Sequence, residues 1–448
     1  MTAAAPHPVP GTRPGPSRRT LLRTATALAG GVAAPAVAGC AGGAGDGVGA
    51  DGRVTVELWH GQTDTGRAAI EKLVAEFNRT HPGIRVDAGG GVLSDVMLQK
   101  ITAALAAGSF PDVAYVFGSD LASVARSPSV VDLTDTFHDH GPVPWKDFWK
   151  PARDAVTLNG RLRAAPALID SLAVVCNRKL FRRAGVPLPR AGWTWGEFVA
   201  TAARLTDRGR GVFGTGWPGV GDEDTVWRLW PMVWDLGGEI VAPDGRRIGF
   251  ADEGVRALRT VAGLAEARSV YIDPKPGTEQ MYQVFNSDRM AMVVTGPWQL
   301  PDIRQAGVDY EVVPLPSYSG RPVTISGPDT WTVFDNGPAR VRAARTFVTW
   351  LSRPAQDVRW DVRAGSLPLS RDTRALPAWQ RQEADTAGLA VFTKSLDSAR
   401  VRPVHAAYPQ ISQAVGEAVT AVLLGRSTPA RAMRDCAEEA NAALIIPR

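Results

Sequence analysis

Residues 54–117 alternate short apolar segments with amphipathic ones, and this pattern restricts the fold more than any other feature of the chain. Residues 54–59, 84–86 and 113–117 are rich in β-branched and aromatic side chains, as expected of buried strands. Between them, residues 65–79 and 96–107 place their apolar side chains at helical spacing. The alternation predicts an α/β fold in which helices cover a mostly parallel sheet.

The first 39 residues have the features of an export signal. They contain no acidic residue, the pair Arg18-Arg19 followed by leucines, and a weakly apolar stretch over residues 25–37. That stretch is shorter than the roughly 20 residues of a membrane-spanning helix, so we interpret it as a removable signal. The arginine pair resembles a twin-arginine signal. The small residues before Cys40 resemble a bacterial lipobox, which makes Cys40 the expected lipidation site.

Removal of the signal changes both the charge and the size of the chain. The whole chain carries a formal charge of +5, and residues 1–39 hold four arginines, so the mature chain is close to +1. It has no dense basic run, which argues against nucleic acid as a partner. Residues 41–51 are mostly Gly and Ala and predict a flexible tether. The 448 residues less the 39 of the signal leave 409, which exceeds the usual size of a single core and predicts two lobes.

The two remaining cysteines, Cys176 and Cys436, cannot form a disulfide-rich scaffold, and their pairing cannot be read from the sequence. A buried free thiol is the simpler expectation for each.

Ligands of open α/β sheets bind at the carboxyl ends of strands, and this rule gives candidate residues directly. Carboxylates and amides accept hydrogen bonds from ligand hydroxyls, and an aromatic ring can cover an apolar face of a ligand. The residues that follow expected strands are His60, Gln62, Asp64, Ser119, Asp120, Trp298, Gly327 and Asp329. For the carboxylates and amides, capping of a nearby helix is the alternative role.

Five segments, taken in order, carry a more specific pattern. The third is the most informative and contains Asn159-Gly160, Ala184-Gly185-Val186-Pro187 and Trp193-Thr194-Trp195-Gly196. The five are residues 54–60 with 73–84, 105–113, 159–198, 285–298 and 313–351. Their order and spacing resemble the family of extracellular solute-binding proteins that serve bacterial ABC importers, in the branch for sugars. The resemblance covers residues 54–420, and Cys176 departs from it by replacing a common aromatic residue.

The resemblance implies a type II periplasmic-binding-protein fold, with ligand held between two discontinuous lobes. We expect a signal peptide (1–39), a lipidated tether (40–52), lobe 1 (53–168 plus 318–366) and lobe 2 (169–317 plus 367–448). The chain is expected to cross between lobes near residues 167–171, 314–319 and 365–370. The first crossing makes Asp170 a further candidate ligand residue. In the family a tryptophan at the position of Trp298 stacks on the sugar.

The tryptophans of residues 217–234 allow two interpretations. Trp227, Trp230 and Trp234 are spaced i, i+3 and i+7, which predicts one helical face, and such a face is more often core than ligand platform. Cleft contact is the alternative, foremost for Trp217 and Trp234. The preceding residues 221–224 predict a helix cap, with a sugar-hydroxyl or metal site as the alternative, because the spacing lacks the full calcium-loop pattern.

The segment 402–410, together with residues 365–368, is similar to glycerol-3-phosphate-binding relatives. There an arginine in the position of Arg402 meets a phosphate, whereas a structural ion pair is the alternative.

Enzyme motifs are absent from the sequence: it has no Gly-x-Ser-x-Gly, His-Glu-x-x-His or Walker loop, and no cofactor or metal is expected. We predict a monomeric lipoprotein, anchored through Cys40 to the outer face of the cytoplasmic membrane. It presents a mono- or oligosaccharide to permease subunits that work with a separate ATPase. A binder of glycerol 3-phosphate or a glycerophosphodiester is the alternative, and a secreted glycan-acting enzyme is the more distant one.

Overall fold

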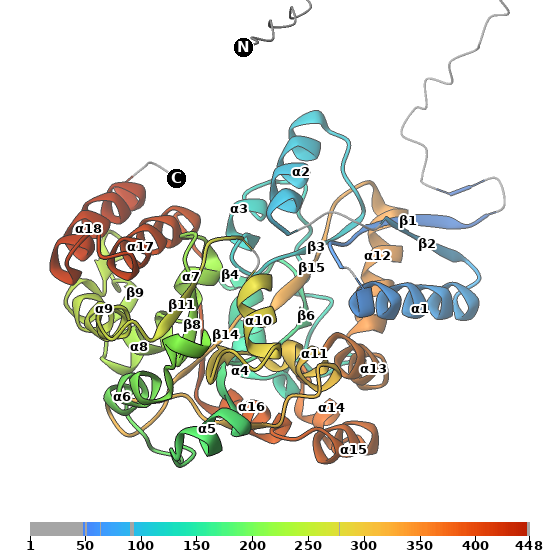
Figure 1. Cartoon of the computed structure of the whole chain (residues 1–448). Helices are drawn as coiled ribbons and strands as arrows, with labels where there is room; N and C mark the ends of the chain where they lie inside the picture. Colours follow the sequence, from blue (N-terminus) through green and yellow to red (C-terminus); the bar gives the residue numbers. More distant parts are fainter. Residues whose placement is uncertain (1–47, 50–51, 63, 90–93, 277, 446–448) are drawn as a thin grey trace, which may run out of the picture. The chain divides into compact units, whose positions relative to one another are not determined.

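The computed structural model describes residues 48–49, 52–62, 64–89, 94–276 and 278–445 (Figure 1). The predicted export signal, Cys40 and nearly all of the tether lie outside these residues. None of the helices within the described ranges is long and apolar enough to cross a membrane.

The first sheet has five strands and mixed pairing. Its order is β2 (Ile84–Gly89), β1 (Val54–Trp59), β3 (Val113–Val116), β15 (Asp329–Val333) and β6 (Ala165–Leu168). β1 runs parallel to β2 and β3, whereas β15 runs antiparallel to both β3 and β6. The prediction of a mostly parallel sheet is therefore wrong for the strands beyond β3. β15 returns to this sheet from the second lobe, so no strand–helix–strand crossover holds it parallel to β3.

Helices cover the first sheet because each buries one apolar face. α1 (Asp64–Thr80) packs against α13 (Pro354–Ala364), and α12 (Pro338–Leu351) packs against β1 (Figure 1). The Phe77 ring lies 4.9 Å from Phe347 and 5.4 Å from Trp350, edge to face. α2 (Ser94–Ala107) precedes β3. The strands and helices predicted over residues 54–117 are thus confirmed to within a few residues.

The second lobe is built on an antiparallel sheet of order β12 (Met292–Thr295), β7 (Ala173–Asn177) and β13 (Tyr310–Val313). A parallel pair, β8 (Thr215–Pro218) and β11 (Val270–Asp273), lies beside it. α9 (Ala251–Glu266), α17 (Tyr408–Leu423) and α18 (Pro429–Ile445) pack against one another (Figure 1). Cys176 in β7 and Cys436 in α18 are buried free thiols, as predicted.

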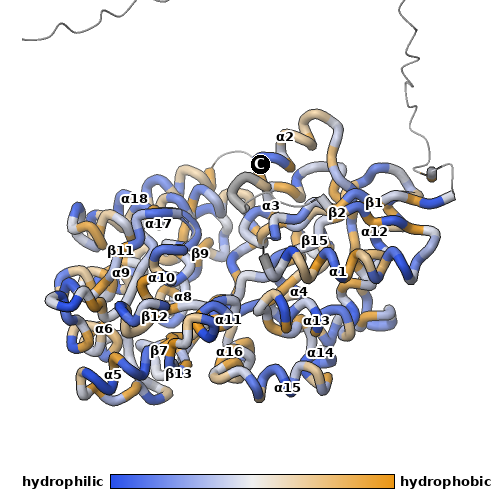
Figure 2. The backbone as a smooth tube through the Cα atoms, turned by 45° about the vertical axis from the view of Figure 1, so that its right-hand side comes forward, coloured by the Kyte–Doolittle hydropathy of each residue, from blue (hydrophilic) through white to orange (hydrophobic). Residues whose placement is uncertain are grey.

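Other elements join these two lobes or cover them. The remaining helices are α3 (Leu121–Val124), α4 (Lys150–Val156), α5 (Arg178–Ala184), α6 (Trp195–Leu205), α7 (Glu223–Trp227), α8 (Trp230–Asp235), α10 (Glu279–Asn286), α11 (Leu300–Gln305), α14 (Arg371–Ala375), α15 (Pro377–Asp385) and α16 (Leu389–Ser395). The short strands are β4 (Thr157–Leu158), β5 (Arg161–Leu162), β9 (Glu239–Val241), β10 (Ile248–Gly249), β14 (Thr324–Ser326) and β16 (Ala399–Val401). In Figure 2 hydrophilic and hydrophobic residues alternate along the helices, as in amphipathic helices that cover a core.

The chain passes from the first sheet to the second between β6 and β7, and returns to the first between β13 and β15. The first passage, residues 169–172, overlaps the expected crossing at residues 167–171, and the second contains residues 314–319. The molecule therefore has an α/β, two-lobe fold with discontinuous lobes. The lobe boundaries given from the sequence stay a prediction.

Candidate ligand-binding cleft

A cavity of about 1180 Å³ is lined by residues that follow strands of both lobes, together with residues of α10 and α11. Eight of the twelve predicted ligand residues line it: Gln62, Ser119, Asp120, Asp170, Trp298, Gly327, Asp329 and Arg402. The strand-end rule gave six of these eight residues, and the family resemblance gave Asp170 and Arg402. Contact with a ligand stays a prediction for each residue.

Strand pairing explains why Gly327 and Arg402 meet although they are far apart in the sequence. β14 and β16 pair in parallel with Ser326 opposite Val401, so their next residues lie side by side. A Cβ atom on Gly327 would come within 2.9 Å of Arg402 Nη2 and 2.7 Å of Trp227 Cζ2. Gly327 therefore allows the arginine and the indole to approach the backbone closely.

Arg402 is held by an ion pair inside the cavity wall. Its Nη1 donates to Glu223 Oε1 at 2.8 Å, and its side chain is only 8% exposed. Tyr408 Oη donates to the same oxygen at 2.8 Å, and Ser412 Oγ donates to the other oxygen. Burial opposes the charged guanidinium, but the neighbouring Glu223 carboxylate outweighs it and raises the pKa of Arg402 further. The ion-pair alternative for Arg402 is therefore present in the structure.

Two buried carboxylates lie beside this ion pair. Asp329 accepts hydrogen bonds from Tyr115 Oη at 2.6 Å and from the Gly118 amide at 3.2 Å. Asp170 accepts one from the Gly327 amide at 2.7 Å. Burial raises the pKa of Asp329 to about 7 and that of Asp170 to about 6. Near neutral pH these groups can both accept and donate hydrogen bonds.

Two parallel tryptophans form the main aromatic surface of the cavity. Trp227 and Trp298 have ring centroids 5.5 Å apart and an angle of 2° between their planes. Trp227 was assigned to one helical face with Trp230 and Trp234, and this was wrong. α7 ends at Trp227 and α8 begins at Trp230, next to Pro231. Trp227 lines the cavity, whereas Trp230 and Trp234 are buried. Asp222 caps α7 by accepting from the Thr225 amide at 3.1 Å, as predicted, and it also lines the cavity.

Three further predicted residues, His60, Trp217 and Trp234, do not belong to the cavity lining. His60 is 1% exposed at the end of β1, and within the described ranges its ring nitrogens have no hydrogen-bond partner. Trp217 is 1% exposed, and its Nε1 donates to the Thr225 carbonyl at 3.0 Å. Trp234 packs below Arg400, whose guanidinium lies 5.0 Å from the ring centre. Both tryptophans thus fit the core interpretation. Asp64 begins α1, and its side chain lies outside what the structure describes.

One face of α10 and one of α11 also line the cavity, and sequence reasoning missed both. Glu279, Tyr282 and Gln283 lie at i, i+3 and i+4 on α10, and Asp302, Gln305 and Ala306 repeat this spacing at α11. The strand-end rule covers only loops that follow strands. A polar face at helical spacing beside Trp298 is the signal that identifies them.

Groups of three or more His, Cys, Asp or Glu side chains able to hold a metal do not occur among the described residues. The lining offers hydrogen-bond acceptors and an aromatic surface, which suit a polyhydroxylated organic ligand.

Comparison of the sequence with known proteins identifies a family and a lipoprotein relative. The bacterial extracellular solute-binding protein model matches residues 61–358. A lipoprotein of the oleD 5′ region of Streptomyces antibioticus is 28% identical over 404 residues, which cover 86% of this chain and 84% of that protein.

Solved structures share the fold. The cyclic α-maltosyl-1,6-maltose binding protein of Arthrobacter globiformis has a TM-score of 0.76 and 23% identity, and the match covers 88% of this chain and 99% of that one. UgpB of Mycobacterium tuberculosis, in complex with glycerophosphocholine, has a TM-score of 0.76 and 19% identity, covering 87% and 98%. On the extent of the family match, the chain belongs to the bacterial extracellular solute-binding proteins.

Proposed function

We propose that this protein captures a carbohydrate in the cleft between its lobes and delivers it intact to the permease of an ABC importer. The observation that carries the proposal is the parallel Trp227–Trp298 pair, placed in a cavity lined by carboxylates and amides. The indole faces suit the C–H side of a sugar ring, and the polar side chains suit its hydroxyls. Closure of the two lobes around the ligand is the hinge motion of periplasmic binding proteins.

The size of the cavity favours an oligosaccharide over a monosaccharide. Its volume of about 1180 Å³ exceeds the roughly 300–1,000 Å³ of most small-molecule sites. The similarity to a cyclic maltosyl-maltose binding protein supports the same choice.

A glycerophosphodiester is the second candidate ligand, because a UgpB structure bound to glycerophosphocholine shares the fold. Recognition of a phosphate needs a free positive charge, and Arg402 is the only cationic side chain among the described residues that line the cavity. Its guanidinium already pairs with Glu223 at 2.8 Å. This pairing favours the carbohydrate.

A thermal-shift screen tests the choice, since a ligand that binds only the folded state raises the melting temperature. We expect neutral maltooligosaccharides or related oligosaccharides to raise it, and glycerol 3-phosphate to leave it unchanged. Stabilisation by glycerol 3-phosphate alone would contradict the carbohydrate proposal. Recovery of hydrolysed sugar would contradict a purely binding role.

The membrane attachment belongs to the same proposal. The signal at residues 1–39 directs export, and Cys40 then carries the lipid. The lipid and the tether over residues 41–51 keep the monomeric binding protein at high local concentration near its permease. A lipoprotein relative of similar length supports this arrangement. The importer's ATPase is expected to be a separate chain.

A further inference from the structure

The cavity lining has a strong excess of negative charge. Within the described part of the chain it contains eight carboxylates and one cationic side chain, that of Arg402. If the two buried carboxylates, Asp170 and Asp329, are counted as neutral, six carboxylates still accompany one guanidinium. A neutral sugar needs hydrogen-bond acceptors, but amides and hydroxyls supply these without a net charge. The excess therefore requires a further explanation.

Arg402 does not offset this charge at the ligand surface. It is 8% exposed, it pairs with Glu223, and its guanidinium lies 5.5 Å from the centre of the Trp227 ring. One positive and one negative charge of the lining thus balance each other inside the wall. Arg402 is the single cation of the described lining, so the negative charge of the lining stays in excess.

Asp170 provides a second and independent observation that points to a ligand donor. It is 6% exposed and lines the cavity, and its Oδ1 accepts from the Gly327 amide. Its Oδ2 has no donor among the residues that the structure describes. A carboxyl group that is nine-tenths removed from solvent is stabilised by each hydrogen-bond donor it gains. Because Asp170 lines the cavity, a ligand can supply that donor to Oδ2.

The more exposed carboxylates of the lining come from three separate elements. Asp222 precedes α7, Glu279 lies in the first turn of α10, and Asp302 lies in the first turn of α11. Charges on separate elements that line one cavity produce a common field, which attracts cations and repels anions. The Trp298 ring, which stacks on Trp227, adds an attraction of the same sign, because the face of an indole ring is electron-rich. The Trp227 ring already has the Arg402 guanidinium 5.5 Å from its centre.

We propose that the ligand of this cleft is a carbohydrate that carries a protonated amine. The ammonium group donates to Asp170 Oδ2 or lies over the paired indoles, within the field of Asp222, Glu279 and Asp302. The inference rests on the proposed function, since the cleft must bind a carbohydrate at all. It goes further in naming a basic sugar as the substrate class.

A pair of matched trisaccharides tests the inference by isothermal titration calorimetry on the purified protein. The trisaccharide of glucosamine carries protonated amines, and its fully N-acetylated form has the same ring number without the charge. We expect the amine form to bind at least about tenfold more tightly at low salt, and this ratio to shrink at about 0.5 M salt, where partly exposed charges are screened. Equal binding by the two forms, or tighter binding of the acetylated form, would overturn the inference and leave the carbohydrate function standing.

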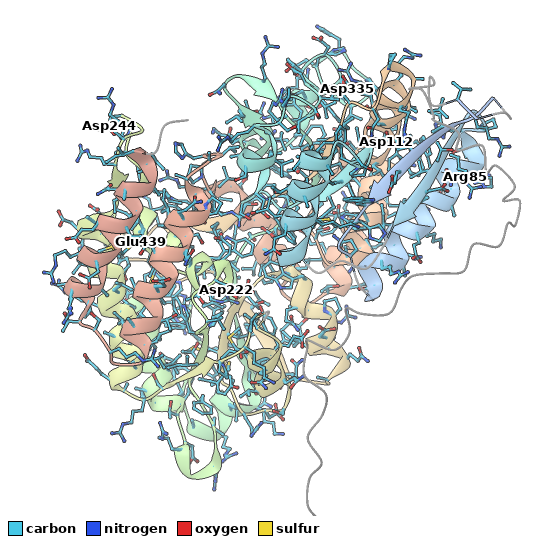
Figure 3. All side chains as sticks on the ribbon, turned by 90° about the horizontal axis from the view of Figure 1, so that it is seen from above. Arg85, Asp112, Asp222, Asp244, Asp335 and Glu439 are labelled. Atoms are coloured by element: carbon cyan, nitrogen blue, oxygen red, sulfur yellow. The ribbon has the colours of Figure 1, made fainter. Side chains whose placement is uncertain are left out.

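Charge-neutralising variants locate the effect. The double variant Asp222→Asn, Glu279→Gln removes two lining charges, and asparagine still caps α7. The control Asp244→Asn, Glu439→Gln makes the same change in net charge at positions outside the lining; Figure 3 labels Asp222 and both control residues.

We expect the ratio of amine to acetyl affinity to fall about three- to tenfold in the first variant, and by less than about twofold in the control. An equal fall in both variants would show that only the overall charge acts, and would overturn the assignment to this cleft. Failure of both trisaccharides to bind would overturn the amine inference. The thermal-shift screen with maltooligosaccharides and glycerol 3-phosphate tests the proposed function separately.

Discussion

Replacement of Glu223 by glutamine tests the account of the ion pair in the cavity wall. Glu223 accepts from Arg402 Nη1 and Tyr408 Oη, each at 2.8 Å, and from Ser412 Oγ. Glutamine has the same shape and keeps one carbonyl acceptor. It removes the negative charge that faces a guanidinium with only 8% exposure. Its amide nitrogen also adds a donor where several donors already converge.

The expected loss of stability follows from these contacts. Loss of one partner of a buried ion pair costs about 3–5 kcal/mol. The Glu223 side chain is 30% exposed, and the glutamine oxygen retains one hydrogen bond, which reduces our expectation to about 2–3 kcal/mol. A folded part of about 400 residues has an unfolding entropy of about 0.8 kcal/mol/K, so the melting temperature should fall by about 2–4 °C.

Differential scanning calorimetry measures this fall directly. Glu417→Gln is the matched control, because Glu417 is exposed on α17, the helix that begins at Tyr408. We expect the control to melt within about 1 °C of the wild type. A Glu223→Gln protein that also melts within about 1 °C of the wild type would refute the claim that Arg402 depends on this carboxylate.

Three further changes have defined outcomes. Burial raises the pKa of Asp170 from 3.8 to about 6, so the folded state holds this proton more tightly and the wild type loses stability as the pH rises from about 4 to about 6. Asp170→Asn lacks this titration, so its free energy of unfolding in urea should rise by up to about 3 kcal/mol relative to that of the wild type as the pH increases from 4 to 7. A difference in unfolding free energy that does not change with pH would contradict the buried ionisation. Gly327→Ala places a Cβ 2.7 Å from Trp227 Cζ2, so Trp227 must shift. Calorimetric titration should show ligand affinity at least about fivefold weaker. Unchanged affinity would mean that the cavity wall at Gly327 and Trp227 moves freely. Cys40→Ala should move the protein from the membrane fraction to the soluble fraction with unchanged ligand affinity, and continued membrane attachment would refute lipidation at this residue.

Local patterns predicted the elements of residues 54–117 well, but not the pairing of distant strands. Helical spacing and β-rich segments depend on near neighbours, and α1, α2, β1 and β3 lie where those patterns place them. The antiparallel position of β15 in the first sheet depends on contacts with residues far away in the sequence. No local pattern encodes such contacts.

The same distinction applies to the cleft. Gln62, Asp120 and Trp298 line the cavity because they follow strands, and the sequence shows where strands end. The helical spacing of Trp227, Trp230 and Trp234 did not show that Trp227 lines the cavity while Trp234 is buried. The pairing of Arg402 with Glu223 joins residues 179 positions apart, and no local pattern of the sequence indicates it.

The most direct test of the carbohydrate-binding cleft is calorimetric titration of wild type and Trp298→Ala with the oligosaccharide that gives the largest thermal shift. The account predicts one site per chain in the wild type and intact ligand after the titration. It predicts affinity at least about tenfold weaker in Trp298→Ala, or about 1.4 kcal/mol, with the folded circular-dichroism spectrum retained. Unchanged affinity in Trp298→Ala would contradict the central claim.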